Sequence, residues 1–335
     1  MSHWMKSISL FWVIMLVAAA GCSSGSNTAA PAETKSNESA AAVAGTIRTF
    51  EDAMGTVDIP GTPVRIVSLD WVYTEELITL GIQPVGAAST EQYRRLYGSN
   101  PELAVDVKDV GERQEPNLEV LAALKPDLII SNLFFSKTNY ESLKGIAPTL
   151  LFNPYPDQGQ INQYEEMEQS FRTIAEIVGK QEEAEQVLAD LQRTYGEAKD
   201  KLKAAGQDGA PFVLSQLFPG QGGANLRLMT DNSTAVQTLQ RIGLNNAYQP
   251  GKFEQYGFSQ TNVEALTPIQ DANFFYVPSE DSGAIEKQLA ENALWKGLEF
   301  VKEQRNYSLG SDAWLFGGPL SAMELANRIV RVLAP

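Results

Sequence analysis

Apolar and polar positions from Thr46 onward predict an alternation of strands and helices. Residues 46–60 alternate in polarity and favour an edge hairpin with its turn at Met54-Gly55. The apolar run Val64–Leu69 predicts a buried strand, and Tyr73–Ile82 has the spacing of a helix that ends at Gly81. The same strand–helix alternation continues through residue 153. Repeated units of this kind predict a parallel sheet with helices on both faces.

The middle of the chain has a different pattern. Residues 162–206 contain no proline, are rich in helix formers and are interrupted near Gly179. Their apolar positions keep helical spacing and predict two helices, the second of them long. Alternating strands and helices restart after Pro211. We therefore predict an N-terminal α/β lobe (46–160), a helical linker (161–206) and a C-terminal α/β lobe (207–335).

One short pattern occurs twice. The stretch "NLEVL" (Asn117–Leu121) and the stretch "NVEAL" (Asn262–Leu266) each precede an apolar strand. Each places a glutamate, Glu119 or Glu264, in the first turn of the predicted helix, where the helix dipole favours a carboxylate by about 0.3–1 kcal/mol. The repeat indicates that the two lobes are related, and each lobe has a parallel sheet at its core.

The N-terminus has the pattern of a targeting segment. Lys6 is followed by an apolar run of 13 residues, 8–20, which is too short to cross a bilayer. The run ends in "AAGC" with the only cysteine of the chain, Cys22, and resembles a lipobox. We predict a signal peptide (1–21), lipidation at Cys22 and a flexible, lipid-anchored tether (22–45) of small polar residues.

Composition excludes several function classes. The formal net charge is -15, so the surface repels phosphate backbones and nucleic acid is not an expected partner. The one histidine, His3, lies in the predicted signal peptide, and Cys22 is expected to carry lipid. This excludes nucleophilic catalysis that needs an imidazole or a thiol, and zinc sites built on them. A hydrolase of the cell wall that works through paired carboxylates stays open as an alternative.

Two facing lobes form a cleft, and ligands of open α/β sheets lie at the carboxyl ends of the strands. The residues expected there are mostly aromatic or arginine, whereas catalytic sites usually show nucleophiles or paired carboxylates. Because Phe134 and Phe135 follow each other at a strand end, we expect at least one of them in the core. The candidate ligand-binding residues are Trp71, Arg94, Arg95, Tyr97, Arg113, Phe135, Arg227, Tyr256, Trp314 and Phe316.

Several motifs carry a resemblance to a known family. They are "RIVSLDWVYTEELITLGIQPVG", "YRRLY", "VGERQEPNLEVLAALKPDLII", "IGLNNAYQ" and "WLFGGPLSAMELANRI", and together they extend over nearly all of residues 60–333. The sequence resembles the iron-siderophore binding proteins of ABC importers, most closely those for ferrichrome and other hydroxamates. The resemblance implies a class III periplasmic-binding-protein-like fold, with two α/β lobes bridged by one long α-helix.

The resemblance also implies roles for single residues. Trp71 matches an aromatic residue that lines the pocket, and either Arg94 or Arg95 matches an arginine that hydrogen-bonds the hydroxamate oxygens. Tyr256 and Trp314 match pocket aromatics of the other lobe. Phenylalanines at 134–135 and 316 stand where ferrichrome binders have tyrosines, which leaves the particular siderophore open.

The implied function is that of a monomeric, non-catalytic binding protein, anchored by lipid on the extracytoplasmic face of a Gram-positive cell membrane. It would capture a ferric siderophore that brings its iron already caged, so neither a cofactor nor a metal site on the protein is expected. Glu119 and Glu264 would dock on the two subunits of a permease driven by a cytoplasmic ATPase. The alternatives are a corrinoid, haem, or a ferric citrate or catecholate complex as ligand.

Overall fold

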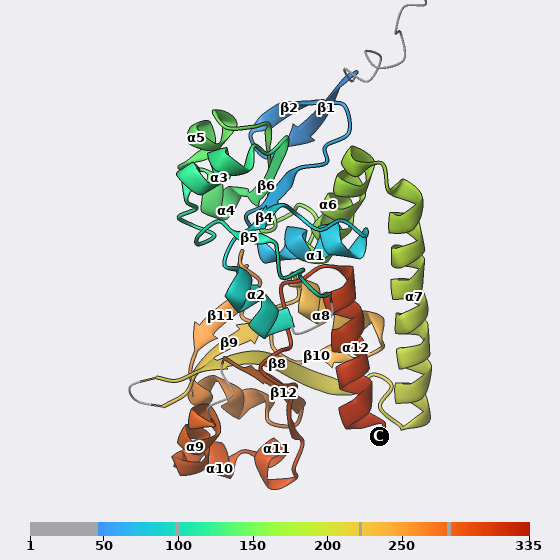
Figure 1. Cartoon of the computed structure of the whole chain (residues 1–335). Coiled ribbons are helices and arrows are strands. Elements are labelled where there is room, and N and C mark those ends of the chain that lie inside the picture. The colour runs from blue at the N-terminus through green and yellow to red at the C-terminus, as the bar shows by residue number, and fades with distance from the viewer. Residues whose placement is uncertain (1–45, 98–100, 221–222, 280–282) are drawn as a thin grey trace, which may run out of the picture. The chain divides into compact units, whose positions relative to one another are not determined.

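The computed structural model describes residues 46–97, 101–220, 223–279 and 283–335 (Figure 1). The predicted signal peptide, the tether and Cys22 lie outside the described residues. The first elements are β1 (Ile47–Asp52) and β2 (Gly55–Pro60), which pair antiparallel. Gly55 has a φ of 131°, a conformation that side-chain-bearing residues rarely adopt, so the glycine permits the turn. The predicted hairpin is confirmed.

The first sheet has five parallel strands in the order β5-β4-β3-β6-β7. Its central strands are buried on both faces, which explains their continuous apolar sequence. The strands are β3 (Ile66–Ser68), β4 (Gly86–Ala87), β5 (Lys108–Asp109), β6 (Leu128–Asn132) and β7 (Thr149–Phe152). The helices between them are α1 (Trp71–Thr79), α2 (Thr90–Tyr97), α3 (Leu118–Leu124), α4 (Leu133–Ser136) and α5 (Tyr140–Lys144).

The second sheet is mixed. Its order is β11-β9-β8-β12-β13, with β10 also paired to β8. The strands β8, β10, β12 and β13 are parallel as predicted, whereas β9 is antiparallel to both β8 and β11. The connection from β8 to β9 is too short for a parallel crossover, so the chain reverses direction there.

The strands of this half are β8 (Pro211–Phe218), β9 (Asn225–Met229), β10 (Asn245–Asn246), β11 (Phe258–Thr261), β12 (Asn273–Pro278) and β13 (Asn306–Ser308). The helices are α8 (Thr234–Arg241), the 3₁₀ helix η1 (Val263–Ile269), α9 (Ala284–Glu291), α10 (Ala293–Gly297), α11 (Glu299–Lys302) and α12 (Pro319–Leu333).

Two helices link the sheets, α6 (Gln163–Val178) and α7 (Gln181–Ala204). Asn162 and Glu165 form a capping box at the start of α6, and Gly179 ends it in the left-handed conformation with a φ of 71°. Both helices and the break between them are as predicted. The long α7 packs along α6 and α12 and runs past both sheets (Figure 1).

One apolar core is continuous between the two sheets. It contains residues of the first sheet such as Ile66, residues of α6 such as Phe171, and residues of the second sheet such as Phe212. Because residues of both sheets pack in the same close-packed core, this core holds the two halves of the chain together. In the described parts of the chain, no helix combines the length and the hydropathy needed to cross a bilayer.

Candidate ligand-binding pocket

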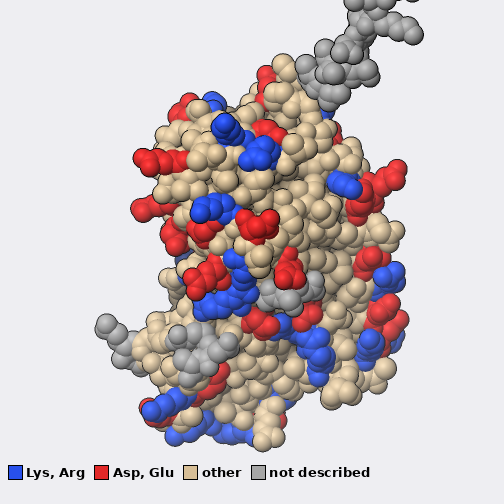
Figure 2. Space-filling view, in the orientation of Figure 1, with Lys and Arg blue, Asp and Glu red and all other residues tan. Residues whose placement is uncertain are grey.

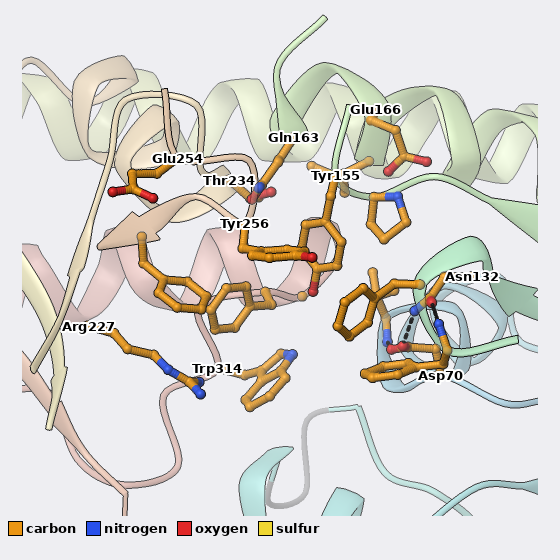
Figure 3. Close-up of a pocket in the computed structure, with 18 of the residues that line it drawn as sticks. Asp70, Asn132, Tyr155, Gln163, Glu166, Arg227, Thr234, Glu254, Tyr256 and Trp314 are labelled. Atoms are coloured by element: carbon orange, nitrogen blue, oxygen red, sulfur yellow. Dashed lines mark hydrogen bonds between the residues drawn. The ribbon is translucent and has the colours of Figure 1, made fainter. Parts of the chain in front are cut away.

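A pocket of about 670 Å³ lies where the two sheets and α6 meet (Figure 3). The first sheet contributes residues that follow β3, β5, β6 and β7, which are the carboxyl ends of parallel strands. The second half contributes β9, β11 and the loop before α12. The lining residues are Asp70, Val72, Arg113, Gln114, Asn132, Phe134, Phe135, Pro154, Tyr155, Gln163, Glu166, Met167, Arg227, Thr234, Lys252, Glu254, Tyr256, Phe258, Gln260, Trp314, Phe316 and Gly317.

Aromatic rings from both halves meet across the pocket. Phe134, Tyr155 and Tyr256 lie edge to face, with ring centroids 5.2 Å apart for Phe134–Tyr256 and for Tyr155–Tyr256. The Phe134–Tyr155 centroids are 5.7 Å apart. Edge-to-face pairs at these distances are attractive, so the three rings hold each other in place. They form a pre-arranged apolar wall for the carbon scaffold of a ligand.

A second run of rings continues this wall. Phe258 lies 6.1 Å from Phe316, Phe316 lies 5.5 Å from Trp314, and Trp314 lies 5.1 Å from Trp71, measured between ring centroids. The indole N–H of Trp71 donates to the carbonyl of Ala88, which fixes that ring. The indole nitrogen of Trp314 is buried and has no hydrogen-bond partner among the described residues. Trp314 therefore has an unused donor at the pocket.

Arg113 is the arginine of the first half that reaches the pocket. Its guanidinium lies 3.8 Å from the Trp71 ring centroid and 4.8 Å from that of Phe135. It pairs with Asp70 Oδ1 at 3.8 Å, and Asn132 Nδ2 donates to Asp70 Oδ2 at 2.5 Å. Burial raises the pKa of Asp70, and the charge of Arg113 opposes that rise. The two rings and Asp70 fix the guanidinium, whose five N–H donors exceed what Asp70 can accept.

Arg227, on β9, is the corresponding group of the second half. Its guanidinium lies 4.7 Å from the ring centroid of Phe218 and 4.7 Å from that of Phe258. It donates to Gln216 Oε1 at 3.5 Å and, within the described residues, forms no ion pair. Burial lowers the pKa of Arg227, but arginine stays charged in proteins. Its donors therefore remain available to an electron-rich ligand.

An acidic region lies beside α1 and α6. Glu166 lines the pocket, and burial raises its pKa to about 8. Glu76 is fully buried and accepts a hydrogen bond from Ser170 Oγ at 3.2 Å. Burial, and then the negative charge of Glu166, raises the pKa of Glu76 well above its ordinary value. The hydroxyl of Tyr73 is buried nearby without a partner among the described residues.

Most of the predicted ligand-binding residues come together in this pocket. Trp71 lies just behind the lining, where it contacts Arg113 and Trp314. Tyr97 is buried, stacks on Tyr93 and lies 6.0 Å from Trp314 between centroids, so it supports the lining from outside. The predicted residues in the lining itself are Arg113, Phe135, Arg227, Tyr256, Trp314 and Phe316.

The structure brings neither Arg94 nor Arg95 into the lining. Both belong to α2, whose first residue Thr90 donates its backbone N–H to Asp109 at 2.7 Å. Arg94 donates to the carbonyls of Leu103 at 3.4 Å and Ala104 at 2.8 Å, and the side chain of Arg95 is exposed. Of the four arginines predicted to bind the ligand, Arg113 and Arg227 lie in the lining.

The expectation that Phe134 or Phe135 lies in the core was wrong. Asn132 caps the short helix α4 by accepting from Phe135 N at 2.8 Å, and this turn directs both rings to the pocket. Phe134 is 53% exposed. An asparagine at a strand end is a sequence signal for such a cap. Tyr155, Gln163 and Glu166 were also missed, and nothing in their local sequence marks them.

Glu119 and Glu264 are exposed and lie outside the pocket lining. Glu119 is in the first turn of α3, where Asn117 Oδ1 accepts from the backbone N–H groups of Glu119 and Val120 at 3.1 Å. Glu264 is in the first turn of the 3₁₀ helix η1, and the side chain of Asn262 makes no capping hydrogen bond there. The repeated sequence therefore folds into two different helix types.

Charge is spread rather than gathered on the visible surface. Acidic and basic side chains alternate over the face shown in Figure 2. Within the described ranges, no group of three or more histidine, cysteine, aspartate and glutamate residues is placed to hold a metal ion. The pocket lining itself combines aromatic rings with the guanidinium groups of Arg113 and Arg227.

Comparison with known proteins gives a consistent result. The chain is 29% identical over 332 residues to the Fe(3+)-citrate-binding protein YfmC of Bacillus subtilis, covering 97% of this chain and 96% of that protein. It is 31% identical over 271 residues to the iron(3+)-hydroxamate-binding protein FhuD of Escherichia coli, covering 81% and 86%.

Among solved structures, the siderophore-binding protein FhuD of Vibrio cholerae with bound Fe3+-Desferal superposes with a TM-score of 0.72. It is 30% identical, with coverage of 81% of this chain and 99% of that one. The family model described as periplasmic binding protein matches residues 66–313, which include both sheets and all but the last pocket residues. The chain belongs to the periplasmic binding protein family.

Proposed function

We propose that this protein captures a ferric siderophore of the hydroxamate class and delivers it to the permease of an ABC importer. One observation carries the proposal: Arg113 and Arg227 each lie on aromatic rings in a pocket that both sheets line. Charged N–H donors suit the oxygen atoms around a caged iron, and the rings suit the carbon scaffold. The relatives named for ferric citrate and ferric hydroxamate support a ferric complex as the ligand. The similar structure with bound Fe3+-Desferal supports the hydroxamate class.

The charge of the pocket favours a hydroxamate complex over an anionic one. The lining carries the acids Asp70, Glu166 and Glu254 together with the bases Arg113, Arg227 and Lys252. A ferric tris-hydroxamate core has no net charge, whereas citrate and catecholate complexes are anionic and would need an excess of bases. Because burial leaves Glu166 largely neutral near pH 7, three bases face two charged acids. This small excess of bases is compatible with a neutral core and is less than a multiply anionic complex would need.

The pocket is less suited to hydrolysis by paired carboxylates. Such a site needs one acid to protonate the leaving group and a second to act as base or nucleophile. Asp70 is paired with Arg113, and Glu254 accepts from Lys252 Nζ at 3.2 Å. Only Glu166, of the lining acids in the described residues, has no ion-pair partner. We therefore propose binding without catalysis.

Tryptophan fluorescence tests the proposal. Trp314 lines the pocket and Trp71 contacts it, so a ferric hydroxamate should quench the emission strongly and saturably. The panel contains ferric desferrioxamine, ferrichrome, ferric citrate, a ferric catecholate, haem and cobalamin, with iron-free desferrioxamine as the control. Saturable quenching by the hydroxamates at the lowest concentrations is the expected result. No saturable response to any iron complex would sink the proposal.

Anchoring and delivery are further parts of this proposal. We propose that the mature protein is a monomer that is lipidated at Cys22 and held on the extracytoplasmic face of a Gram-positive cell membrane. Incorporation of labelled palmitate into the wild-type protein, and its loss in Cys22→Ala, tests the anchor. We also propose that Glu119 and Glu264 contact the two permease subunits.

A further inference from the structure

Two charged residues of the pocket lining have no ion-pair partner among the described residues. Asp70 pairs with Arg113, and Glu254 pairs with Lys252. This leaves Arg227 and Glu166 as the lining charges without an ion-pair partner in the described residues. Figure 3 shows them on opposite sides of the pocket, with Trp314 and Tyr256 between them. An unused base on one side and an unused acid on the other match a ligand with two different polar ends.

Glu166 lies among other acidic groups. Glu166 belongs to α6 and faces α1, which contributes Tyr73 and Glu76, both buried, and Asp70 at its N-cap. Tyr155 contributes another phenol near the middle of the pocket, beside Tyr256 (Figure 3). The base on this side, Arg113, is already engaged by Asp70. A cationic group placed beside Glu166 would favour the ionised form of this carboxyl and pair with it.

We propose that Glu166 is a specificity-determining residue that accepts a cationic amine on the ligand, so the pocket prefers ferric hydroxamates that carry a free ammonium group. This inference rests on the proposed function and narrows its ligand class. The ammonium would pair with Glu166, while the oxygen-rich iron centre would receive the donors of Arg227. Amines of this kind are strongly hydrated, and a carboxylate at the pocket wall replaces that hydration with a charged hydrogen bond.

The release of a proton from Glu166 on ligand binding is a second measurable consequence of this inference. Because burial raises the pKa of Glu166 to about 8, this group is largely neutral in the empty pocket near pH 7. An ammonium beside it stabilises the ionised form and lowers its pKa. Binding of an amine-bearing ligand should therefore release close to one proton, and binding of the same ligand with its amine acetylated should release none.

The experiment uses a matched pair of ligands. Ferric desferrioxamine B is a linear tris-hydroxamate whose terminal amine does not bind iron, and its N-acetyl derivative differs only at that amine. Both are titrated into wild-type protein, Glu166→Gln and the control Glu176→Gln by calorimetry in buffers of different ionisation enthalpy. Glu176 is an exposed glutamate on the same helix α6, so it matches the chemical change outside the pocket.

The wild-type protein and Glu176→Gln should bind the amine form at least about tenfold more tightly than the acetylated form, as expected for one charged hydrogen bond. Glu166→Gln should lose both this preference and the proton release. Equal affinities in wild type, or a preference that persists in Glu166→Gln, would overturn the inference while leaving siderophore binding intact. If neither ligand binds the wild-type protein, the proposed function itself is contradicted.

Discussion

Glu75 holds Ser321 with two hydrogen bonds that join α1 to the start of α12. Ser321 N donates to Glu75 Oε1 at 2.8 Å, and Ser321 Oγ donates to Glu75 Oε2 at 2.7 Å. Gly318 N adds a third bond to Oε2 at 2.9 Å. A carboxylate at a helix N-terminus is favoured by the helix dipole and satisfies donors that the helix leaves free. The loop with Trp314 and Phe316 leads directly into this junction, so Glu75 positions one wall of the pocket.

Removing this carboxylate should destabilise the protein. Glu75→Ala leaves the buried N–H of Gly318 and the two part-buried donors of Ser321 without an acceptor. A buried donor left unsatisfied costs about 1–3 kcal/mol, and water can reach the Ser321 donors in part, so we expect a loss of about 2–4 kcal/mol in unfolding free energy. Glu75→Gln keeps one acceptor oxygen and should lose less. Urea denaturation measures the change, with Glu102→Ala, an exposed site, as the control. An unfolding midpoint of Glu75→Ala equal to that of wild type would contradict this role.

The acidic region at α1 and α6 should make stability depend on pH. The folded-state pKa values of Glu76 and Glu166 are raised above the ordinary value of 4.5, for Glu166 to about 8. Between these values the unfolded chain has lost protons that the folded protein still binds, so stability falls as pH rises from about 4.5 to about 8. For Glu166 alone the slope approaches about 1.4 kcal/mol per pH unit.

Glu166→Gln isolates this effect from other titrating groups. The difference in unfolding free energy between the variant and wild type should be small near pH 5 and should favour the variant by about 1–3 kcal/mol near pH 8. Urea denaturation at both pH values gives this difference, and Glu176→Gln serves again as the control. A difference that stays constant across the range would show that Glu166 ionises as it does in the unfolded chain.

The sequence was sufficient for the alternation of strands and helices, since buried strands and amphipathic helices differ in periodicity. It also named Arg227, Tyr256 and Trp314, which line the pocket, although Arg227 lies within β9 and Tyr256 just before β11 rather than at the carboxyl ends of strands. It could not indicate which way a helix turns its side chains, and so Arg94 was expected in the pocket although it binds the carbonyl of Ala104. Glu166 escaped notice because its position depends on how α6 packs against α1.

The arginines can be separated by mutation. Arg227→Ala removes unpaired donors from the pocket and should weaken ferric hydroxamate binding about 10- to 100-fold, with little change in stability. Arg113→Ala should weaken binding similarly and also lower stability, because the buried Asp70 loses its ion-pair partner. Arg95→Ala is the matched control and should bind as wild type does. Fluorescence titration measures the affinity, and urea denaturation measures the stability. If Arg95→Ala weakens binding more than Arg113→Ala and Arg227→Ala do, the ligand contacts α2 instead.

Trp314 should account for most of the fluorescence response. It lines the pocket, whereas Trp295 packs against Phe274 and Phe300 in a separate apolar cluster. Trp314→Phe keeps an aromatic ring, so binding should be weakened modestly while the ligand-induced quenching falls by roughly half or more. Trp295→Phe should retain the full quenching. Calorimetry supplies the affinity independently of the signal, and unchanged quenching in Trp314→Phe would place the ligand elsewhere.

Charge reversal tests the proposed contacts with the permease. Glu119 and Glu264 are exposed and outside the pocket, so Glu119→Arg and Glu264→Arg should bind ferric hydroxamate with wild-type affinity. If each carboxylate pairs with a base on one permease subunit, reversal replaces attraction with repulsion and should lower siderophore-dependent iron uptake about tenfold or more. The matched controls are Glu115→Arg and Glu291→Arg, which reverse exposed charges at other positions of the same halves. The measurement is uptake of radiolabelled iron by cells that produce each variant at the same level. If the double variant Glu119→Arg/Glu264→Arg takes up iron as the wild type does, these residues have no docking role.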